Sequence, residues 1–154
     1  MRRLVNLYPP YVGAAIRVRR TESGGYLARM KLTWYNRNLF GTHFGGSLYA
    51  MCDPFFSIIL LEELGRGFIV WDKAATIDFR RPGKGTVSAR FEIPAAQVEE
   101  IREIALREGK TEPRFSAQIV DGDGEVVAIV EKVIYVRAKN RTPSPTTNRA
   151  ASPR

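Results

Sequence analysis

One stretch of the sequence decides both the fold and the candidate site: Asn38-Leu-Phe-Gly-Thr-His-Phe-Gly-Gly-Ser-Leu-Tyr-Ala-Met-Cys-Asp53-Pro54. It places two glycines, Gly45 and Gly46, at the start of a strongly apolar segment that carries a single carboxylate, Asp53. A helix that begins at this pair directs its unpaired backbone N–H groups, and the positive end of its dipole, at whatever lies before it. Because glycine has no Cβ, a ligand can approach that backbone closely.

The chemistry of this stretch suits a carbonyl substrate. A helix start of this kind can hold a carbonyl oxygen that gains negative charge, as acyl transfer requires. Asp53 lies about two helical turns further on, and it can attack the carbonyl or activate a water there. A structural alternative stays open, because Asp53 followed by Pro54 is also the pattern of an N-cap with a first-turn proline. The pattern favours a small acyl-transfer or hydrolysis site.

The composition predicts one domain. The chain has 154 residues, 44% of them hydrophobic, which is enough for one domain with a real core. We expect a cytoplasmic protein with no membrane span, because no apolar run is long enough to cross a bilayer or to act as a signal peptide. The single cysteine, Cys52, excludes an internal disulfide and supplies no metal-ligand pattern.

The net charge of +8 is concentrated at the C-terminus. Residues 137–154 hold five basic residues and no acidic one; without them, 19 basic residues face 16 acidic ones, a net charge of +3. The tail is rich in Pro, Ser, Thr and Asn and has no aromatic residue, so we predict disorder there and no nucleic-acid partner. The predicted organisation is one domain over residues 1–137 and a basic, disordered tail over 138–154.

Hydrophobic periodicity predicts the order of the elements. Alternating residues indicate a hairpin over 14–35 and strands over 69–81, 86–93, 114–121 and 125–137. Residues 47–64 are apolar almost all round, so they predict a buried helix that other elements must cover. Residues 94–108 predict an amphipathic surface helix. The expected fold class is α+β: a curved antiparallel sheet wrapped around one long buried helix, with a second peripheral helix.

Two motifs carry a resemblance to a known superfamily. They are Gly41-Thr-x-Phe-Gly-Gly-Ser-Leu-Tyr49 followed by Asp53-Pro54, and Trp71-Asp-Lys-Ala-Ala-Thr-Ile-Asp-Phe-Arg-Arg-Pro-Gly-Lys-Gly85. Over roughly residues 12–137, the chain resembles the hotdog-fold acyl-CoA thioesterases, in particular the phenylacetyl-CoA thioesterase-like branch. It is most similar to a family of uncharacterised proteins described as thioesterases, which share the first motif.

The resemblance implies a hotdog dimer, in some members paired again into a tetramer, with active sites at the subunit interface. In those thioesterases the helix acid is the nucleophile or general base, the Gly-Gly backbone polarises the thioester carbonyl, and an upstream Asn positions the reacting groups. These roles map onto Asp53, onto Gly45 and Gly46, and onto Asn38. The structural alternatives are tight helix packing for the glycines and turn closure for Asn38.

The chain departs from the family at one position. Phe44 stands where the family has a His before the glycine pair, and the only histidine, His43, lies one position earlier. A lone histidine is more often structural than catalytic, so His43 is a secondary catalytic candidate. Burial and the neighbouring negative charge of Asp53 should suppress the thiolate of Cys52, so this residue is expected to be part of the core.

Further candidates concern substrate binding. Lys73 is expected to contact the acyl carbonyl or to pair with Asp72 or Asp53. The group Arg80, Arg81 and Lys84 is expected to hold the phosphates of coenzyme A, or alternatively to form a solvated strand edge. Four apolar residues predict a hydrophobic acyl pocket: Phe44, Met51, Phe55 and Trp71.

The leading prediction is hydrolysis of an acyl-CoA or acyl-carrier thioester, with Asp53 as general base or nucleophile and no cofactor beyond the substrate. The first alternative is a hotdog dimer that binds an acyl chain or lipid without turnover, which Phe44 favours. A hydratase or dehydratase ranks lower, since the spacing from His43 to Asp53 is shorter than that chemistry uses. Fold alone does not decide among them.

Overall fold

The computed structural model of the protein describes residues 5–139. The predicted tail, 138–154, lies outside this range except for Ala138 and Lys139. Within the described range, no helix is both long enough and apolar enough to cross a membrane.

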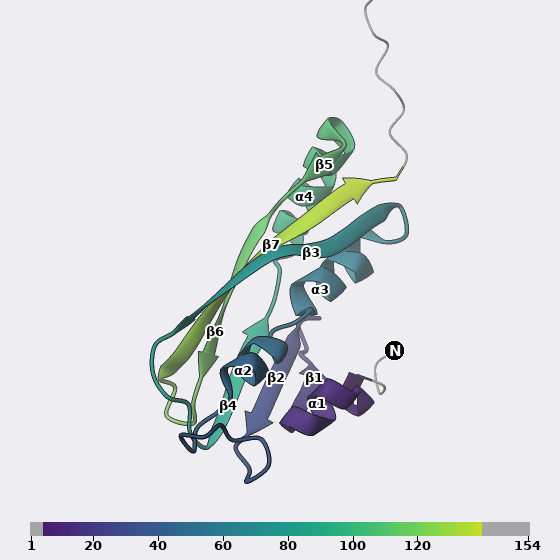
Figure 1. Ribbon diagram of the computed structural model, residues 1–154. Helices are drawn as coiled ribbons and strands as arrows, with labels where there is room; N and C mark the ends of the chain where they lie inside the picture. Colours follow the sequence, from purple (N-terminus) through teal and green to yellow (C-terminus); the bar gives the residue numbers. More distant parts are fainter. Residues whose placement is uncertain (1–4, 140–154) are drawn as a thin grey trace, which may run out of the picture.

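In residues 5–139, seven strands form one antiparallel sheet (Figure 1). The strands are β1 (Ile16–Arg20), β2 (Tyr26–Lys31), β3 (Phe68–Phe79), β4 (Thr86–Phe91), β5 (Lys110–Thr111), β6 (Arg114–Val120) and β7 (Val126–Ala138). They lie in the order β1-β2-β4-β6-β7-β3, and the short β5 pairs with β7. The helical elements are η1 (Val5–Leu7), α1 (Pro9–Ala14), α2 (Gly45–Ala50), α3 (Phe55–Leu64) and α4 (Ala95–Glu108).

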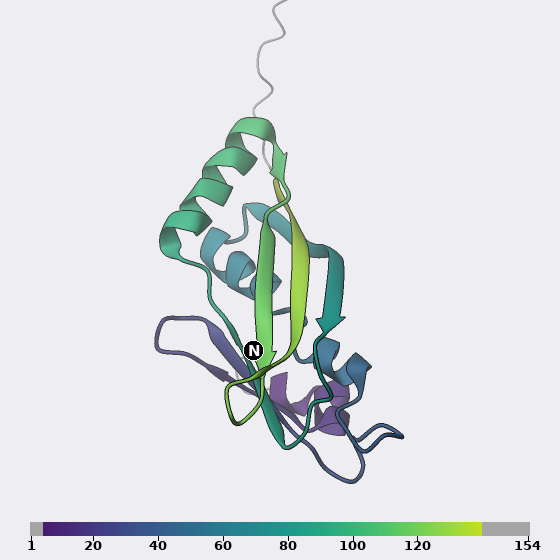
Figure 2. The ribbon, with the colours of Figure 1, turned by 90° about the vertical axis from the view of Figure 1, so that its left-hand side faces the viewer.

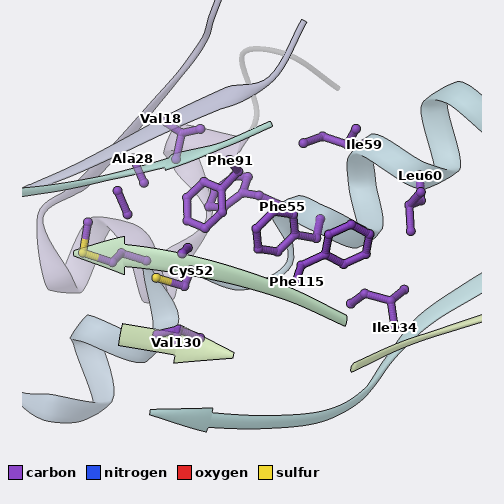
Figure 3. Packing of buried hydrophobic residues seen from close by; sticks show 14 of the residues in the cluster. Val18, Ala28, Cys52, Phe55, Ile59, Leu60, Phe91, Phe115, Val130 and Ile134 are labelled. Carbon is purple, nitrogen blue, oxygen red and sulfur yellow. The ribbon is translucent and has the colours of Figure 1, made fainter. Parts of the chain in front are cut away.

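The sheet curves, and α3 packs against its inner face while α4 covers one end (Figures 1 and 2). Aromatic rings fill the space between α3 and the strands (Figure 3). The Phe55 ring lies 4.9 Å from that of Phe91, and the Phe56 ring stacks on Phe115 at the same centroid distance. Burial of this apolar surface is the main favourable contribution to folding.

The predicted buried helix over 47–64 forms two helices instead of one. It is interrupted between Met51 and Pro54, where the Asp53–Pro54 peptide bond is cis. Proline has no backbone N–H to donate, and its ring clashes with the preceding helical turn, so the helix restarts at Phe55. We call the residues from Met51 to Pro54 the elbow.

Two further details differ from the sequence expectation. The strand β2 ends at Lys31, and Trp34 lies beyond it with 80% of its surface exposed, although alternation placed Trp34 inside a strand. Helix α1 was not predicted, because its six residues are too few to show a helical period. Its Tyr11 is nevertheless buried in the core.

Strand β3 lies at one side of the sheet (Figure 2), and within the described range it is hydrogen-bonded to β7 alone. Trp71 and Phe79 on this strand are about half exposed. Leu39 and Phe40, in the loop before α2, are exposed almost completely. Such a collection of exposed large apolar side chains is typical of a surface that another molecule covers.

Phe91→Ala tests the importance of the aromatic core. Phe91 is fully buried against Phe55 and Phe56, so the truncation should lower the free energy of unfolding by about 3–5 kcal/mol. Leu106→Ala, at a half-exposed position on α4, is the control and should cost about 1 kcal/mol or less. Chemical denaturation measures both, and equal losses would contradict this description of the core.

Candidate active site

Asp53 lies in the elbow between α2 and α3. The hydroxyl of Tyr11, on α1, donates a hydrogen bond to the backbone carbonyl of Asp53, so the N-terminal helix holds the elbow from outside. The carboxylate itself is 43% exposed. The helix is broken at Asp53–Pro54, as the N-cap alternative expected, but the N-cap position of α3 is Pro54 and no side-chain hydrogen bond caps the helix.

A buried lysine of β7, Lys132, joins Asp53 to a second carboxylate. Its Nζ donates to Oδ1 of Asp53 at 2.6 Å and to Oδ2 of Asp72, on β3, at 3.0 Å. Ser57, on α3, donates from its hydroxyl to Oδ1 of Asp72 at 3.0 Å. Lys132 is only 1% exposed, and its Nζ lies 5.3 Å from the centre of the Tyr49 ring. We call Asp53, Lys132 and Asp72 the acid–lysine cluster.

The surroundings of the cluster set its charges. Burial opposes the charge of Lys132, but hydrogen bonds to the two carboxylates outweigh it and raise the pKa of the lysine. Burial, and then hydrogen bonding with Asp53, raise the pKa of Asp72. Burial raises the pKa of the Cys52 thiol to about 12. Cys52 is therefore a neutral core residue and no nucleophile, as predicted.

Asp53 borders a cavity of about 630 Å³, which we call the elbow cavity. Its walls are mostly apolar and come from α1, β1, α2 and α3; they include Tyr8, Tyr11, Tyr49, Pro54, Phe55 and Ile58. The opposite part of the wall is polar, where Arg20, Tyr26 and Glu62 bond to one another. A cavity of this size and lining is typical of a small-molecule site.

A second, more open pocket of about 430 Å³ lies along β3. Asp72 and Lys73 line it, and Tyr49 borders both this pocket and the elbow cavity. Asp53 thus faces one hollow and Asp72 the other, while Lys132 is buried between the two carboxylates.

The glycine pair opens α2, at the other end of this short helix. The first intrahelical hydrogen bonds there run from Ser47 and Leu48 to the Phe44 carbonyl, so the Gly45 and Gly46 N–H groups precede them. A Cβ on Gly46 would come within 2.5 Å of the Phe44 ring, and one on Gly45 within 3.0 Å of the Phe79 ring. The glycines therefore also serve close packing, which was their structural alternative.

Comparison with known proteins places this architecture. Residues 1–136 match a family described as a domain of unknown function, DUF4442. The chain belongs to the DUF4442 family. A search of the curated proteins finds no match.

Among solved structures, the chain is similar to a protein of unknown function from Pseudomonas aeruginosa that is named as a probable thioesterase. The two are 26% identical, and the match has a TM-score of 0.76 and covers 89% of this DUF4442 chain and 93% of the other. A thioesterase from Haemophilus influenzae is 14% identical, with a TM-score of 0.65 over 91% and 90%. A mutant thioesterase from Pseudomonas aeruginosa is 12% identical, with a TM-score of 0.64 over 87% and 89%. The last two likenesses show the fold alone.

The likeness to these structures confirms the predicted hotdog fold for this DUF4442 member. The name of the first, a probable thioesterase, also supports a thioesterase-like protein at a coarse level.

The loop candidates Asn38 and His43 make structural contacts. The Asn38 side chain bonds to Thr42, to the His43 carbonyl and to the Phe40 N–H, all within its own loop. The His43 ring is buried, and its Nε2 lies 3.1 Å from the Gly85 carbonyl. The Asn38 bonds thus close the loop before α2, and the His43 contact attaches that loop to the turn after β3.

The basic candidates divide into two places. Arg80, Arg81 and Lys84 lie at the end of β3 and in the turn that His43 contacts, hence near the start of α2. Arg80 pairs with Asp78, and Arg81 with Asp121. Lys73 pairs with Glu112 at 2.7 Å instead of with Asp72 or Asp53 as expected, because a bulge between Asp72 and Ala74 turns successive side chains apart.

Of the four residues expected to form the acyl pocket, Phe55 alone lines the elbow cavity. Met51 is fully buried in the core, and Phe44 and Trp71 are about half exposed on the surface.

Sequence reasoning missed Lys132 and the pairing role of Asp72. The signal was present, because Lys132 occupies an inward position between Val130 and Ile134 in the alternating strand. A lysine at a core-facing position needs a buried carboxylate. Its partners lie on other elements, so no local pattern identifies them.

Burial lowers the pKa of His43, and the Gly85 carbonyl opposes this only in part. The unfolded chain therefore binds the proton more readily, and the free energy of unfolding should fall as pH decreases through about 6.5. His43 is the only histidine, so His43→Gln should flatten this part of the curve. Denaturation at stepwise pH from 7.5 to 5.5 measures both proteins, and parallel curves would refute the assignment.

Proposed function

We propose that this protein is an acyl-thioester hydrolase in which Asp53 is the general base. The observation that carries the proposal is the position of the Asp53 carboxylate, which is partly exposed on the wall of an apolar cavity and is held by a buried ammonium. A cavity of about 630 Å³ has room for an acyl group, and its walls exclude water from most of that group. The thioesterase names of the structural neighbours support the same reaction class.

In the proposed reaction, Asp53 takes a proton from a water whose oxygen attacks the thioester carbonyl carbon. The carbonyl oxygen becomes an oxyanion, which the Gly46 N–H receives. When the tetrahedral intermediate collapses, the carbon–sulfur bond breaks and the thiolate takes the proton from Asp53. The products are a carboxylic acid and a thiol. We favour the role of general base over that of nucleophile for Asp53. The ammonium of Lys132 withdraws negative charge from Oδ1, which makes this oxygen a weaker nucleophile.

The proposed site uses a second copy of the chain. Gly46 lies in the first turn of α2, and Asp53 follows the end of that helix in the elbow, so the two groups belong to opposite ends of α2. In the hotdog thioesterases that the sequence resembles, the active sites lie at the subunit interface. We therefore propose a homodimer in which Asp53 of one copy and Gly46 of the other act on the same thioester. The outer side of β3 and the exposed apolar residues near it are the proposed contact surface.

The proposed substrate is a coenzyme A thioester, as in the phenylacetyl-CoA thioesterase-like branch that the sequence resembles. Arg80, Arg81 and Lys84 lie beside the loop that precedes α2, and we propose that they contact the phosphates. Asn38 is proposed to act indirectly, since its side chain shapes that loop.

The second candidate is a dimer that binds an acyl chain or lipid without hydrolysis. It is favoured by Phe44, an apolar ring that packs closely against Gly46 at the position where the family has a histidine. Lipid that co-purifies with the protein, together with no turnover of any thioester, would support it. The hydratase alternative gains no support, because the single histidine is buried against Gly85.

Asp53→Asn is the central test. In a panel of acyl-CoA substrates, the substitution should lower kcat by roughly 10²- to 10⁴-fold, because the amide cannot accept the proton of water. The fold should persist, because Lys132 keeps Asp72 as its counter-ion. Asp123→Asn, in the exposed turn before β7, is the control and should retain the wild-type rate. An Asp53→Asn variant with an unchanged rate would rule out the proposed role.

Lys84→Ala tests the coenzyme A end. Lys84 is exposed, so its contact with a phosphate should stabilise the bound substrate about as much as a surface ion pair does. Its removal should therefore raise KM for an acyl-CoA roughly two- to five-fold, with kcat unchanged. A truncated thioester of the same acyl group without phosphates should show no change in KM. A similar rise for both substrates would show that Lys84 does not contact the phosphates.

A further inference from the structure

We propose that Lys132 and Asp72 are a positioning pair for Asp53: Asp72 remains the permanent counter-ion of Lys132, so that Asp53 alone gains and loses the proton during turnover. This inference rests on the proposed function, because it assigns a role in the same reaction to two residues beyond the expected site.

The two carboxylates hold the lysine differently. Both oxygens of Asp72 are engaged, Oδ1 by the Ser57 hydroxyl and Oδ2 by Lys132, each at 3.0 Å. In Asp53 the bond from Lys132 engages Oδ1, and the side chain is twice as exposed as that of Asp72, 43% against 21%. Asp53 faces the elbow cavity, where substrate is proposed to bind. Asp72 is thus the fixed member of the cluster and Asp53 the one in contact with the reaction.

The charge of the cluster explains why two carboxylates are needed. With both carboxylates ionised and Lys132 protonated, the cluster carries a net charge of −1. When Asp53 accepts a proton from water, the remaining ammonium and carboxylate are still paired, and the cluster is neutral. Without Asp72, the same proton transfer would leave a fully buried ammonium with no anion, which is strongly unfavourable. Asp72 therefore allows Asp53 to act as a base.

The groups around the cluster do not take over this role. Cys52 keeps its proton because burial raises its pKa to about 12, and burial likewise raises the pKa of Tyr11 above its ordinary value. Tyr49 presents its ring face, not its hydroxyl, to Lys132. Lys73, the neighbour of Asp72 on β3, is turned to Glu112, and Glu131 alternates to the exposed face of β7. Asp72 is the remaining rival for the proton: burial and Asp53 raise its pKa, whereas the hydrogen bonds from Lys132 and Ser57 oppose this rise.

Asp72→Asn is the first experiment. Asp53 then becomes the only anion beside Lys132, and proton transfer to it would leave the buried ammonium unpaired, so kcat should fall by about ten-fold or more and the acid limb of the kcat/KM profile should move to lower pH. Asp123→Asn, in the exposed turn before β7, is the matched control, with an unchanged profile expected. An Asp72→Asn enzyme with the wild-type kcat and acid limb would overturn the proposal.

The double variant Asp72→Asn with Lys132→Met removes both the ammonium and its counter-ion. Asp53 is then a single carboxylate with no buried charge to balance, so the double variant should be several-fold faster than Asp72→Asn alone. A structural role for the pair predicts the opposite, a double variant at least as slow as the single one. Thermal unfolding of each variant shows whether the rates belong to folded protein.

A measurement of protonation states in the wild-type protein tests the proposed pairing without any variant. Carboxyl and Nζ resonances followed by NMR from about pH 5 to pH 9 should show that Lys132 stays protonated and that Asp72 stays ionised as its counter-ion. Titration of Asp72, or loss of the Lys132 proton, in this range would overturn the proposal. If the protein turns over no thioester, the proposed function fails, while this titration still tests the pairing.

Discussion

A lysine side chain withdrawn from water must find an anion inside the protein, and Lys132 finds two. It projects from the middle of β7, and its partners come from β3 and from the elbow between α2 and α3. One ammonium therefore ties the sheet to the broken helix at the point where the elbow cavity begins. Such a cluster is costly to assemble, so its main consequence is precise placement of charge and not stability.

The break at Pro54 has an equal influence on the site. A continuous helix would carry Asp53 on one of its faces, among core residues. The elbow instead exposes the carboxylate to a cavity whose outer wall is the N-terminal helix, and Tyr11 holds that wall to the Asp53 backbone. The short α2 then separates Asp53 from the glycine pair. Within one chain the acid and the helix start therefore lie at opposite ends of α2, an arrangement that agrees with the proposed dimer.

The loop before α2 shows how a residue can matter to a site without touching substrate. Asn38 closes the loop on itself, and His43 attaches it to the Gly83–Gly85 turn. This places the helix start and the basic residues after β3 at the same end of the subunit. Sequence spacing indicated that these residues belong together, but their contacts assign them a scaffolding part.

The α+β class and the order of the main strands could be derived from the sequence, because alternation and turn residues are local signals, and the two motifs carry the hotdog resemblance. Helix α1 was not predicted, and the break between α2 and α3 was expected only in the N-cap alternative. The sequence also singled out Asp53, since one carboxylate in an apolar segment is conspicuous. Tertiary structure alone decided that Lys132 and Asp72 meet it, because β7, β3 and the elbow are distant along the chain. It also decided that Lys73 faces Glu112 and that Phe55, not Phe44, lines the cavity. Local periodicity tells which side of an element is buried, whereas the partner of a buried charge depends on which elements the fold brings together.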